Sequence, residues 1–123
     1  MSSKKKMIRG MLVPKHCIYV DCIREVKAEQ DGIDDIHKEL EVNCFDVARV
    51  MWDGKEISIY VDDEGALISG NTGRDVNGYP TPLFGNLLIF GSVDNYGRTL
   101  DLPSEFDEEY VYNKISKPMY EIS

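Results

Sequence analysis

The sequence predicts an α+β fold: a single antiparallel-rich sheet of about five to six strands, with one short helix packed on it and a C-terminal helix. Apolar residues alternate with period two along several stretches, which is typical of half-buried strands. The spacing becomes helical after Gly32, and turn dipeptides such as Asp53-Gly54 separate the stretches. The resulting order of strand, strand, helix, several strands and helix favours one sheet with helices on one face.

The chain of 123 residues fits one domain. We expect a disordered basic tail over residues 1–7, a single domain over 8–115 and a C-terminal tail over 116–123. Ile8–Val13 is apolar enough for a first strand. Cys17–Ala28 alternates over a long stretch, with Ile18 on the apolar side, and is predicted to form a half-buried strand antiparallel to the first. Ile23 on the polar side and Arg24 on the apolar side interrupt this alternation.

A helix of about ten residues is predicted where apolar side chains recur at helical spacing. These residues are Ile33, Ile36, His37 and Leu40. Phe45–Trp52 then returns to strand character, and Ile57–Val61 forms the second strand of a hairpin. Asp53-Gly54 between them tolerates the positive φ angles of a two-residue turn.

The second half of the chain contains a long irregular segment followed by an apolar run. The run Leu83–Phe90 ends without alternation, which predicts a central strand covered on both faces. Asp101-Leu102-Pro103-Ser104 opens the predicted C-terminal helix, with Ser104 as its N-cap. The first turns of this helix carry acids that complement the helix dipole. They are Glu105, Asp107, Glu108 and Glu109.

The charge of the chain is unevenly distributed. The net charge is −8, but five of the 14 basic residues lie within the first 15 positions, which leaves −13 from His16 onward. Such a charge repels phosphate backbones and disfavours direct nucleic-acid binding. An acidic protein can still imitate nucleic acid toward a basic protein, and a local basic pocket can still hold a small anion. The alternative is that the charge only keeps a small protein soluble.

Catalytic and metal-binding patterns are missing from the sequence. It has no nucleophile elbow, Walker loop or His-Glu-x-x-His helix, so we expect a non-enzymatic protein without a cofactor. His16 and His37 do not combine with the cysteines at metal-ligand spacing. Cys17, Cys22 and Cys44 are interpreted as small core or near-core residues. No apolar run is long enough for a membrane span or a signal peptide, so we expect a cytoplasmic protein.

Several motifs together carry a resemblance over roughly residues 8 to 100. They are Pro14 with Tyr19-Val20, the short helix ending near Leu40, Ile59–Gly65, Asn71, Leu83–Asn86 and Leu87–Gly91. This pattern resembles an uncharacterised family of phages, prophages and mobile elements, known only as a domain of unknown function. The sequence departs from it between Asn71 and Thr81, where it is longer and richer in glycine. The resemblance implies a phage or mobile-element accessory protein, and it carries no known activity across.

The irregular segment 70–84 is the candidate ligand-binding loop. It offers flexible glycines, one guanidinium, amides, hydroxyls and aromatic rings, which suit a small anionic or nucleotide-like ligand. The predicted contacts are Asn71, Thr72, Arg74, Asn77, Tyr79, Thr81 and Phe84, with Arg74 neutralising charge and the aromatic rings stacking. The alternative is a mobile hairpin connection in which Arg74 pairs with Asp75 or another surface acid.

Trp52 and Tyr60 are the candidate partner-binding residues. Both lie in the predicted hairpin, where they are placed to form a surface aromatic patch. The competing interpretation is that Trp52 closes the end of the core. We also expect Ile8–Val13 to be an exposed edge strand that can pair across a two-fold axis in a homodimer.

These observations lead to one functional hypothesis and one alternative. The first is a non-enzymatic phage or mobile-element protein that counters host defence by sequestering a nucleotide-like signal or blocking a host protein. The alternative is an acidic nucleic-acid mimic that inhibits a host enzyme acting on DNA or RNA.

Overall fold

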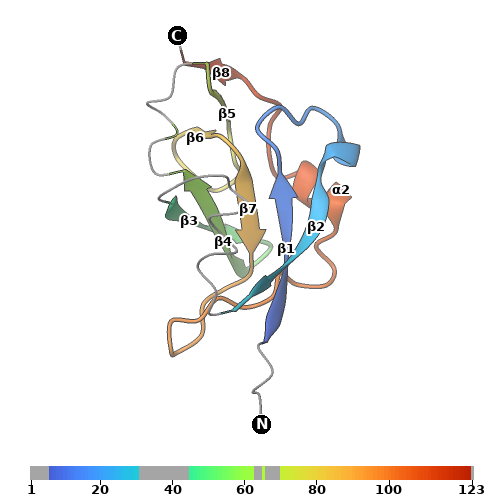
Figure 1. The fold of residues 1–123 in the computed structure, drawn as a ribbon, viewed down its shortest axis with the longest axis vertical. Helices are drawn as coiled ribbons and strands as arrows, with labels where there is room; N and C mark the ends of the chain where they lie inside the picture. The colour runs from blue at the N-terminus through green and yellow to red at the C-terminus, as the bar shows by residue number, and fades with distance from the viewer. Residues whose placement is uncertain (1–5, 31–44, 63–64, 66–69, 123) are drawn as a thin grey trace.

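The computed structural model of the protein describes residues 6–30, 45–62, 65 and 70–122. Strands dominate these residues, and Figure 1 shows them arranged as one larger sheet with a smaller group of strands at one end. The strands are β1 (Met7–Val13), β2 (Arg24–Glu29), β3 (Phe45–Trp52), β4 (Lys55–Asp62), β5 (Thr72–Arg74), β6 (Leu83–Phe84), β7 (Leu87–Phe90) and β8 (Tyr120–Glu121). The helical elements are the 3-10 helix η1 (Val20–Cys22) and the α-helix α2 (Glu108–Tyr112).

The larger sheet has five antiparallel strands in the order β2-β1-β7-β4-β3. β7 lies at its centre, with Leu88 opposite Leu12 of β1 and also opposite Tyr60 of β4. All four residues of β7 are buried, which confirms that this apolar run is a central strand covered on both faces. β1 pairs with a neighbour on each side, so the prediction of an exposed edge strand at Ile8–Val13 is wrong.

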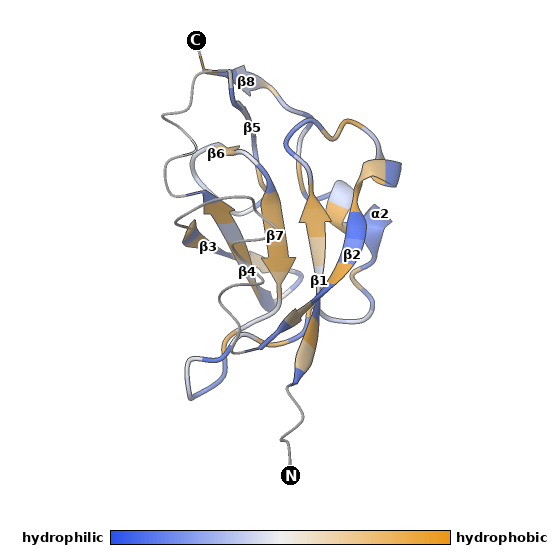
Figure 2. Ribbon diagram, viewed as in Figure 1, coloured by the Kyte–Doolittle hydropathy of each residue, from blue (hydrophilic) through white to orange (hydrophobic). Residues whose placement is uncertain are grey.

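Alternate residues of the large sheet build two hydrophobic clusters, one on each face. Leu87 and Ile89 of β7 belong to the larger cluster, and Leu88 and Phe90 belong to the smaller one. Figure 2 shows β1 and β7 coloured as hydrophobic along most of their length, whereas β2 is largely hydrophilic. Burial on both faces therefore fixes the register of the central strands, because a slip of one residue would exchange the two sets of side chains.

The predicted hairpin is confirmed. β3 and β4 pair along their full length, from Phe45 opposite Asp62 to Trp52 opposite Lys55. Asp53 and Gly54 have φ angles of 52° and 78°, and positive values at both central positions are what a type I′ turn requires. The Asp-Gly dipeptide therefore sets the register of this edge of the sheet.

The smaller sheet has three strands in the order β6-β5-β8. The apolar run over residues 83–90 is divided between the two sheets, since β6 ends at Phe84 and β7 begins at Leu87. Gly85 lies at the division with a φ of 91°, a conformation that glycine adopts without strain. The turn at Gly85 therefore passes the chain from one sheet to the other.

The predicted α+β class with a single sheet is wrong, because the described residues are mostly β and form two antiparallel sheets. The predicted C-terminal helix is reduced to the five residues of α2, which begins at Glu108. Its N-cap is Asp107, whose carboxylate accepts a hydrogen bond from the Tyr110 backbone N–H, and not Ser104. The predicted helix at Ile33–Leu40 lies outside the described residues.

The predicted long strand over Cys17–Ala28 is also wrong in its first half. The turn of η1 interrupts it, and only Arg24–Glu29 forms a strand, antiparallel to β1 as expected. Ile23 is 4% exposed, although the alternating pattern placed it on the polar side. The chain turns here because contacts from distant residues hold the segment that follows β1, as described next.

Candidate functional site

The predicted ligand-binding cation is turned into the protein. Arg74 is only 2% exposed, and its Nη1 donates a hydrogen bond to the Ser116 carbonyl at 3.1 Å. Its Nη2 donates to the carbonyls of Pro14 and Lys15, at 3.1 and 3.2 Å. Burial lowers the pKa of the guanidinium from its ordinary value, although negative charge at Cys17 acts in the opposite direction. Arg74 therefore joins three backbone segments, and this geometry does not support its predicted role of clamping a dissolved phosphate.

The other residues predicted to bind a ligand divide into two groups. Asn71 and Thr72 make internal contacts: the Asn71 amide donates to the Gly65 carbonyl at 2.8 Å, and the Thr72 hydroxyl donates to the Lys15 carbonyl at 2.8 Å. Phe84 is half-buried and covers Gly73, where an added Cβ would lie 2.6 Å from the ring. These three side chains therefore support the small sheet and its neighbours.

The second group lies in the turn between β5 and β6. Asn77 and Thr81 are exposed, whereas Tyr79 is half-buried and packs against the larger core cluster. The Asn77 carbonyl accepts a hydrogen bond from the Trp52 indole N–H at 2.8 Å. The structure thus brings Thr72 and Arg74 together at the Lys15 carbonyl, directs Asn71 to Gly65, and leaves Asn77 and Thr81 on a separate turn.

The predicted surface patch of Trp52 and Tyr60 does not form. Trp52 is 0% exposed and belongs to the larger core cluster, in agreement with the competing interpretation that it closes the end of the core. Tyr60 is 7% exposed, and its hydroxyl makes a hydrogen bond of 2.5 Å with the Thr99 hydroxyl. Trp52 lies in the larger hydrophobic cluster and Tyr60 in the smaller one on the opposite face, which is why neither ring reaches solvent.

Residues 14–23, named here the anchored loop, form the best-defined candidate site. Within the loop, the Cys17 amide donates to the Pro14 carbonyl at 3.0 Å and the Cys22 amide donates to the Tyr19 carbonyl at 3.1 Å. The Ile18 carbonyl accepts a hydrogen bond from the Tyr112 hydroxyl of α2 at 3.0 Å. Together with the Arg74 contacts, these bonds fix the backbone of the loop from several sides.

The anchored loop presents large apolar side chains to solvent. Ile18 is 42% exposed and Tyr19 is 64% exposed, and they are adjacent in the chain. Ordinarily a side chain of this size is buried when the fold allows it, and an exposed aromatic ring on a fixed backbone is typical of a contact surface. The sequence pattern had assigned Ile18 to the buried face of a strand, so this surface was not found from the sequence.

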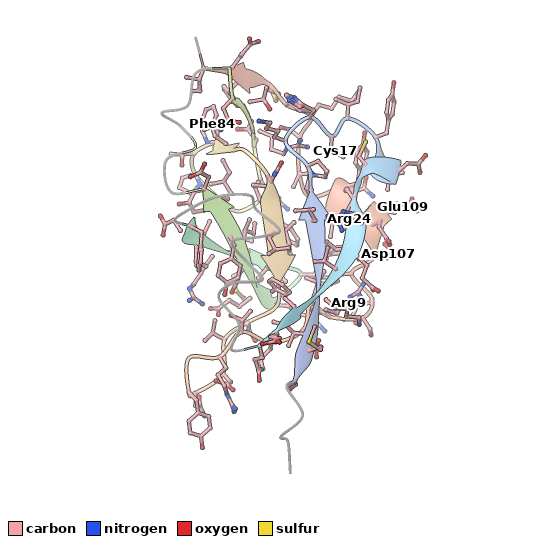
Figure 3. The ribbon with its side chains drawn as sticks, in the orientation of Figure 1. Arg9, Cys17, Arg24, Phe84, Asp107 and Glu109 are labelled. Carbon is pink, nitrogen blue, oxygen red and sulfur yellow. The ribbon has the colours of Figure 1, made fainter. Side chains whose placement is uncertain are left out.

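The same loop holds two thiols in different environments. Cys17 is 1% exposed and Cys22 is exposed, so the prediction of a core or near-core position is right for Cys17 and wrong for Cys22. Burial, followed by the hydrogen bond and charge of Cys22, raises the pKa of Cys17 to about 11. A hydrogen bond from the Tyr19 backbone, followed by one from Cys17, lowers the pKa of Cys22. Figure 3 shows Cys17 at the end of the large sheet, beside η1.

A second arginine fastens the segment that leads into α2. The guanidinium of Arg9 donates to the carbonyls of Leu102, Pro103 and Phe106, at 3.2, 3.0 and 3.0 Å. It also pairs with Glu25 of β2 at 2.5 Å. Figure 3 labels Asp107 and Glu109 on the same side of the view as Arg9, whose guanidinium reaches the carbonyl of the residue before Asp107. Arg9 therefore holds the backbone of residues 102–106 in place, and the exposed carboxylates of Asp107 and Glu109 follow directly after this segment.

Within the part of the chain that the structure describes, no three His, Cys, Asp or Glu side chains are grouped to hold a metal ion. No helix among the described residues is long and apolar enough to cross a membrane. Comparisons with protein-family models, with curated proteins and with solved structures found no match. The resemblance to a phage and mobile-element family therefore stays a prediction from the sequence motifs.

Proposed function

We propose that the protein is a non-enzymatic binding protein that acts by contacting another protein through the anchored loop. The observation that carries this proposal is the exposure of Tyr19 and Ile18 on a backbone that distant residues hold in place. Tyrosine supplies a large contact area at a small cost in conformational entropy, and it is common among the residues that dominate binding energy. A loop that is already fixed loses little further freedom when it binds.

The charge of the chain indicates the chemistry of the partner. The net charge from His16 onward is −13, and Asp21 in the anchored loop is exposed. A partner with an apolar contact area and a basic rim would complement this surface, and opposite charges would accelerate association. In this form the protein blocks a host protein, and the assignment to a phage or mobile element rests on the sequence resemblance. The proposed cytoplasmic location rests instead on the sequence, in which no apolar run is long enough for a membrane span or a signal peptide.

The nucleotide-sequestering form of the hypothesis has less support. It required a cation that a phosphate can reach, and the donors of Arg74 are directed to three backbone carbonyls. Asn77 and Thr81 remain accessible, but they supply no positive charge. We therefore favour a protein over a small anion as the bound partner.

The proposal is tested in the cell that produces the protein, by replacing Tyr19 with a photo-crosslinking amino acid. The matched control carries the same amino acid in place of Tyr96. Tyr96 is also exposed, at 83%, but lies in the turn after β7. A discrete protein adduct is expected from position 19 and not from position 96. With that partner purified, Tyr19→Ala should weaken binding at least about tenfold, and Tyr96→Ala by less than about twofold. Equal adducts or equal affinities at the two positions would refute the proposal.

A second candidate function, the acidic mimic of nucleic acid, is favoured by a different surface. Glu105, Asp107 and Glu109 are exposed on the segment that Arg9 fastens. The test is displacement of fluorescent duplex DNA from purified host nucleic-acid-binding enzymes. A mimic displaces the DNA in a salt-sensitive manner, and Glu109→Lys abolishes the effect, whereas Glu121→Lys in β8 does not. No displacement at low salt, or equal loss in the two variants, would exclude this function.

A further inference from the structure

The two thiols of the anchored loop form an asymmetric pair. Cys17 and Cys22 share one backbone acceptor, because the Cys22 amide donates at 3.1 Å to the same Tyr19 carbonyl that the Cys17 thiol contacts. Cys17 is 1% exposed, whereas Cys22 is open to solvent. The Cys17 thiol also donates to the Tyr19 carbonyl at 3.0 Å, which holds it in place. One sulfur is therefore accessible to a reagent from solution, and the second is accessible only to the first.

We propose that Cys17 and Cys22 are a reversible disulfide site, oxidised by exchange with a small-molecule disulfide such as oxidised glutathione. The inference rests on the Tyr19 carbonyl that both cysteines contact and on the unequal exposure of the two residues, and it does not depend on the proposed function. Cys22 is the attacking residue because it is exposed, and Cys17 is the resolving residue because it is buried beside the same carbonyl.

The exchange proceeds in two balanced steps. The Cys22 thiolate attacks one sulfur of the glutathione disulfide, so the bond between the two glutathione sulfurs breaks and one glutathione thiolate leaves. The Cys17 thiol then loses its proton to solvent, and its thiolate attacks the Cys22 sulfur. The mixed disulfide breaks, and the second glutathione leaves. The two protein thiols lose two electrons and two protons in total, and one glutathione disulfide becomes two glutathione thiols.

The surroundings of the pair assist both steps. The Tyr19 backbone and Cys17 stabilise the Cys22 thiolate by hydrogen bonds, and a thiolate is the form that attacks a disulfide. Once Cys22 has joined glutathione, its hydrogen bond and its charge no longer hold the proton on Cys17. The positive charge of Arg74, which favours the Cys17 thiolate, remains beside it. The resolving thiol therefore becomes easier to deprotonate at the step where its thiolate is needed.

The test is an equilibrium redox titration of the full chain in glutathione buffers, followed by alkylation of free thiols and mass spectrometry of the intact protein and its peptides. Wild type and Cys44→Ser should lose the mass of two hydrogens and give a peptide linked through Cys17 and Cys22. Residues joined by a short loop have effective concentrations of millimolar order, so at about 0.1 mM glutathione the internal disulfide should exceed the mixed one roughly tenfold.

The variants separate the two roles. Cys17→Ala should stop at a glutathione adduct on Cys22, and Cys22→Ser should give neither an adduct nor a disulfide within the loop. The proposal is overturned if wild type retains all three alkylatable thiols at every buffer ratio, if it accumulates only the mixed disulfide, or if the linkage joins two chains through Cys22. The wild-type peptide map decides among these outcomes without any variant, so a folding defect in Cys17→Ala leaves the test intact.

Discussion

The large sheet and the anchored loop are both ordered, but different interactions hold them. In the sheet, strands β1, β7 and β4 bury alternate side chains in two hydrophobic clusters. The anchored loop exposes Ile18 and Tyr19 and is held by hydrogen bonds from Arg74, Thr72 and Tyr112 to its carbonyls. Within the loop only Cys17 and Ile23 are buried in the larger cluster, and polar contacts from distant residues hold the backbone between them. Ile18 and Tyr19 can therefore stay exposed on an ordered backbone.

The largest expected effect comes from removing the polar anchor. Arg74→Met removes three charge-assisted hydrogen bonds, and we expect a loss of about 3 kcal/mol or more in the free energy of unfolding. The Pro14 and Lys15 carbonyls keep their bonds from the Cys17 amide and the Thr72 hydroxyl, whereas the Ser116 carbonyl loses its donor. Arg74→Lys is the control, because an ammonium group keeps the charge but cannot reproduce the fork of the guanidinium. Urea denaturation should rank wild type above Lys and Lys above Met. A loss below about 1 kcal/mol in Arg74→Met would show that the carbonyls do not depend on this side chain.

The matching change in the sheet is Gly10→Ala in β1. An added Cβ would lie 2.5 Å from the Phe90 ring and 2.6 Å from the Ile89 carbonyl, so the central strands must separate. We expect a loss of about 2–3 kcal/mol by urea denaturation, as for other overpacked cores. Gly54→Ala in the hairpin turn has open space around it and only a positive φ to strain, so it should cost about 1 kcal/mol. Equal losses for the two variants would contradict the close packing of β1 on β7.

A smaller effect is expected from the buried hydroxyl pair that joins β4 to the segment after β7. Tyr60→Phe removes the hydrogen bond to Thr99 while keeping the ring packed against Phe45 and Phe90, and it should cost about 1 kcal/mol. Thr99→Val removes the other partner. In a double-mutant cycle the combined variant should lose less than the sum of the two single variants. Simple additivity would show that the two hydroxyls do not interact.

The smallest effect is a pH dependence at the exposed end of the hairpin. Burial, then the hydrogen bond to Asp53, raises the pKa of Tyr110 from 10 to about 12. Because the folded state holds this proton more tightly, the contribution to stability is complete below pH 10 and is lost as the pH rises toward 12. Ultraviolet titration should show a tyrosine with a pKa of about 12 that is missing in Tyr110→Phe and that titrates earlier in Asp53→Asn. The hydrogen bond to Asp75 also raises the pKa of Tyr120, so that tyrosine should still titrate late in Tyr110→Phe. An unchanged number of late tyrosines in Tyr110→Phe would assign the shift to another residue.

The contrast between the two regions also explains what the sequence could predict. The strands at Ile8–Val13 and Phe45–Trp52, the Asp53-Gly54 turn and the buried strand at Leu87–Phe90 follow from apolar periodicity and turn chemistry, which are local properties. The division of the run 83–90 between two sheets was not predicted. Gly85 within this run could equally belong to one continuous strand, and only the pairing of β6 and β7 with different strands identifies it as a turn.

The candidate site was less predictable than the fold. Arg74 was singled out as the unusual cation of its loop, but its partners are carbonyls of Pro14, Lys15 and Ser116, and any residue type can supply a carbonyl. No sequence pattern marks such partners. The only local signal of the anchored loop was the break in alternation at Ile23 and Arg24, and the structure places the interruption just before these residues, at Val20–Cys22.

The central claim is that Arg74 holds the anchored loop in a fixed conformation, and amide hydrogen exchange measured by NMR tests it most directly. The amides of Cys17, Cys22 and Ile23 donate hydrogen bonds within the loop and should be protected in wild type. In Arg74→Lys their exchange should accelerate, while that of Leu88 in β7 changes much less. Exchange of the three loop amides at the rate of an unstructured peptide in wild type, or an equal acceleration in the loop and in β7, would contradict the claim.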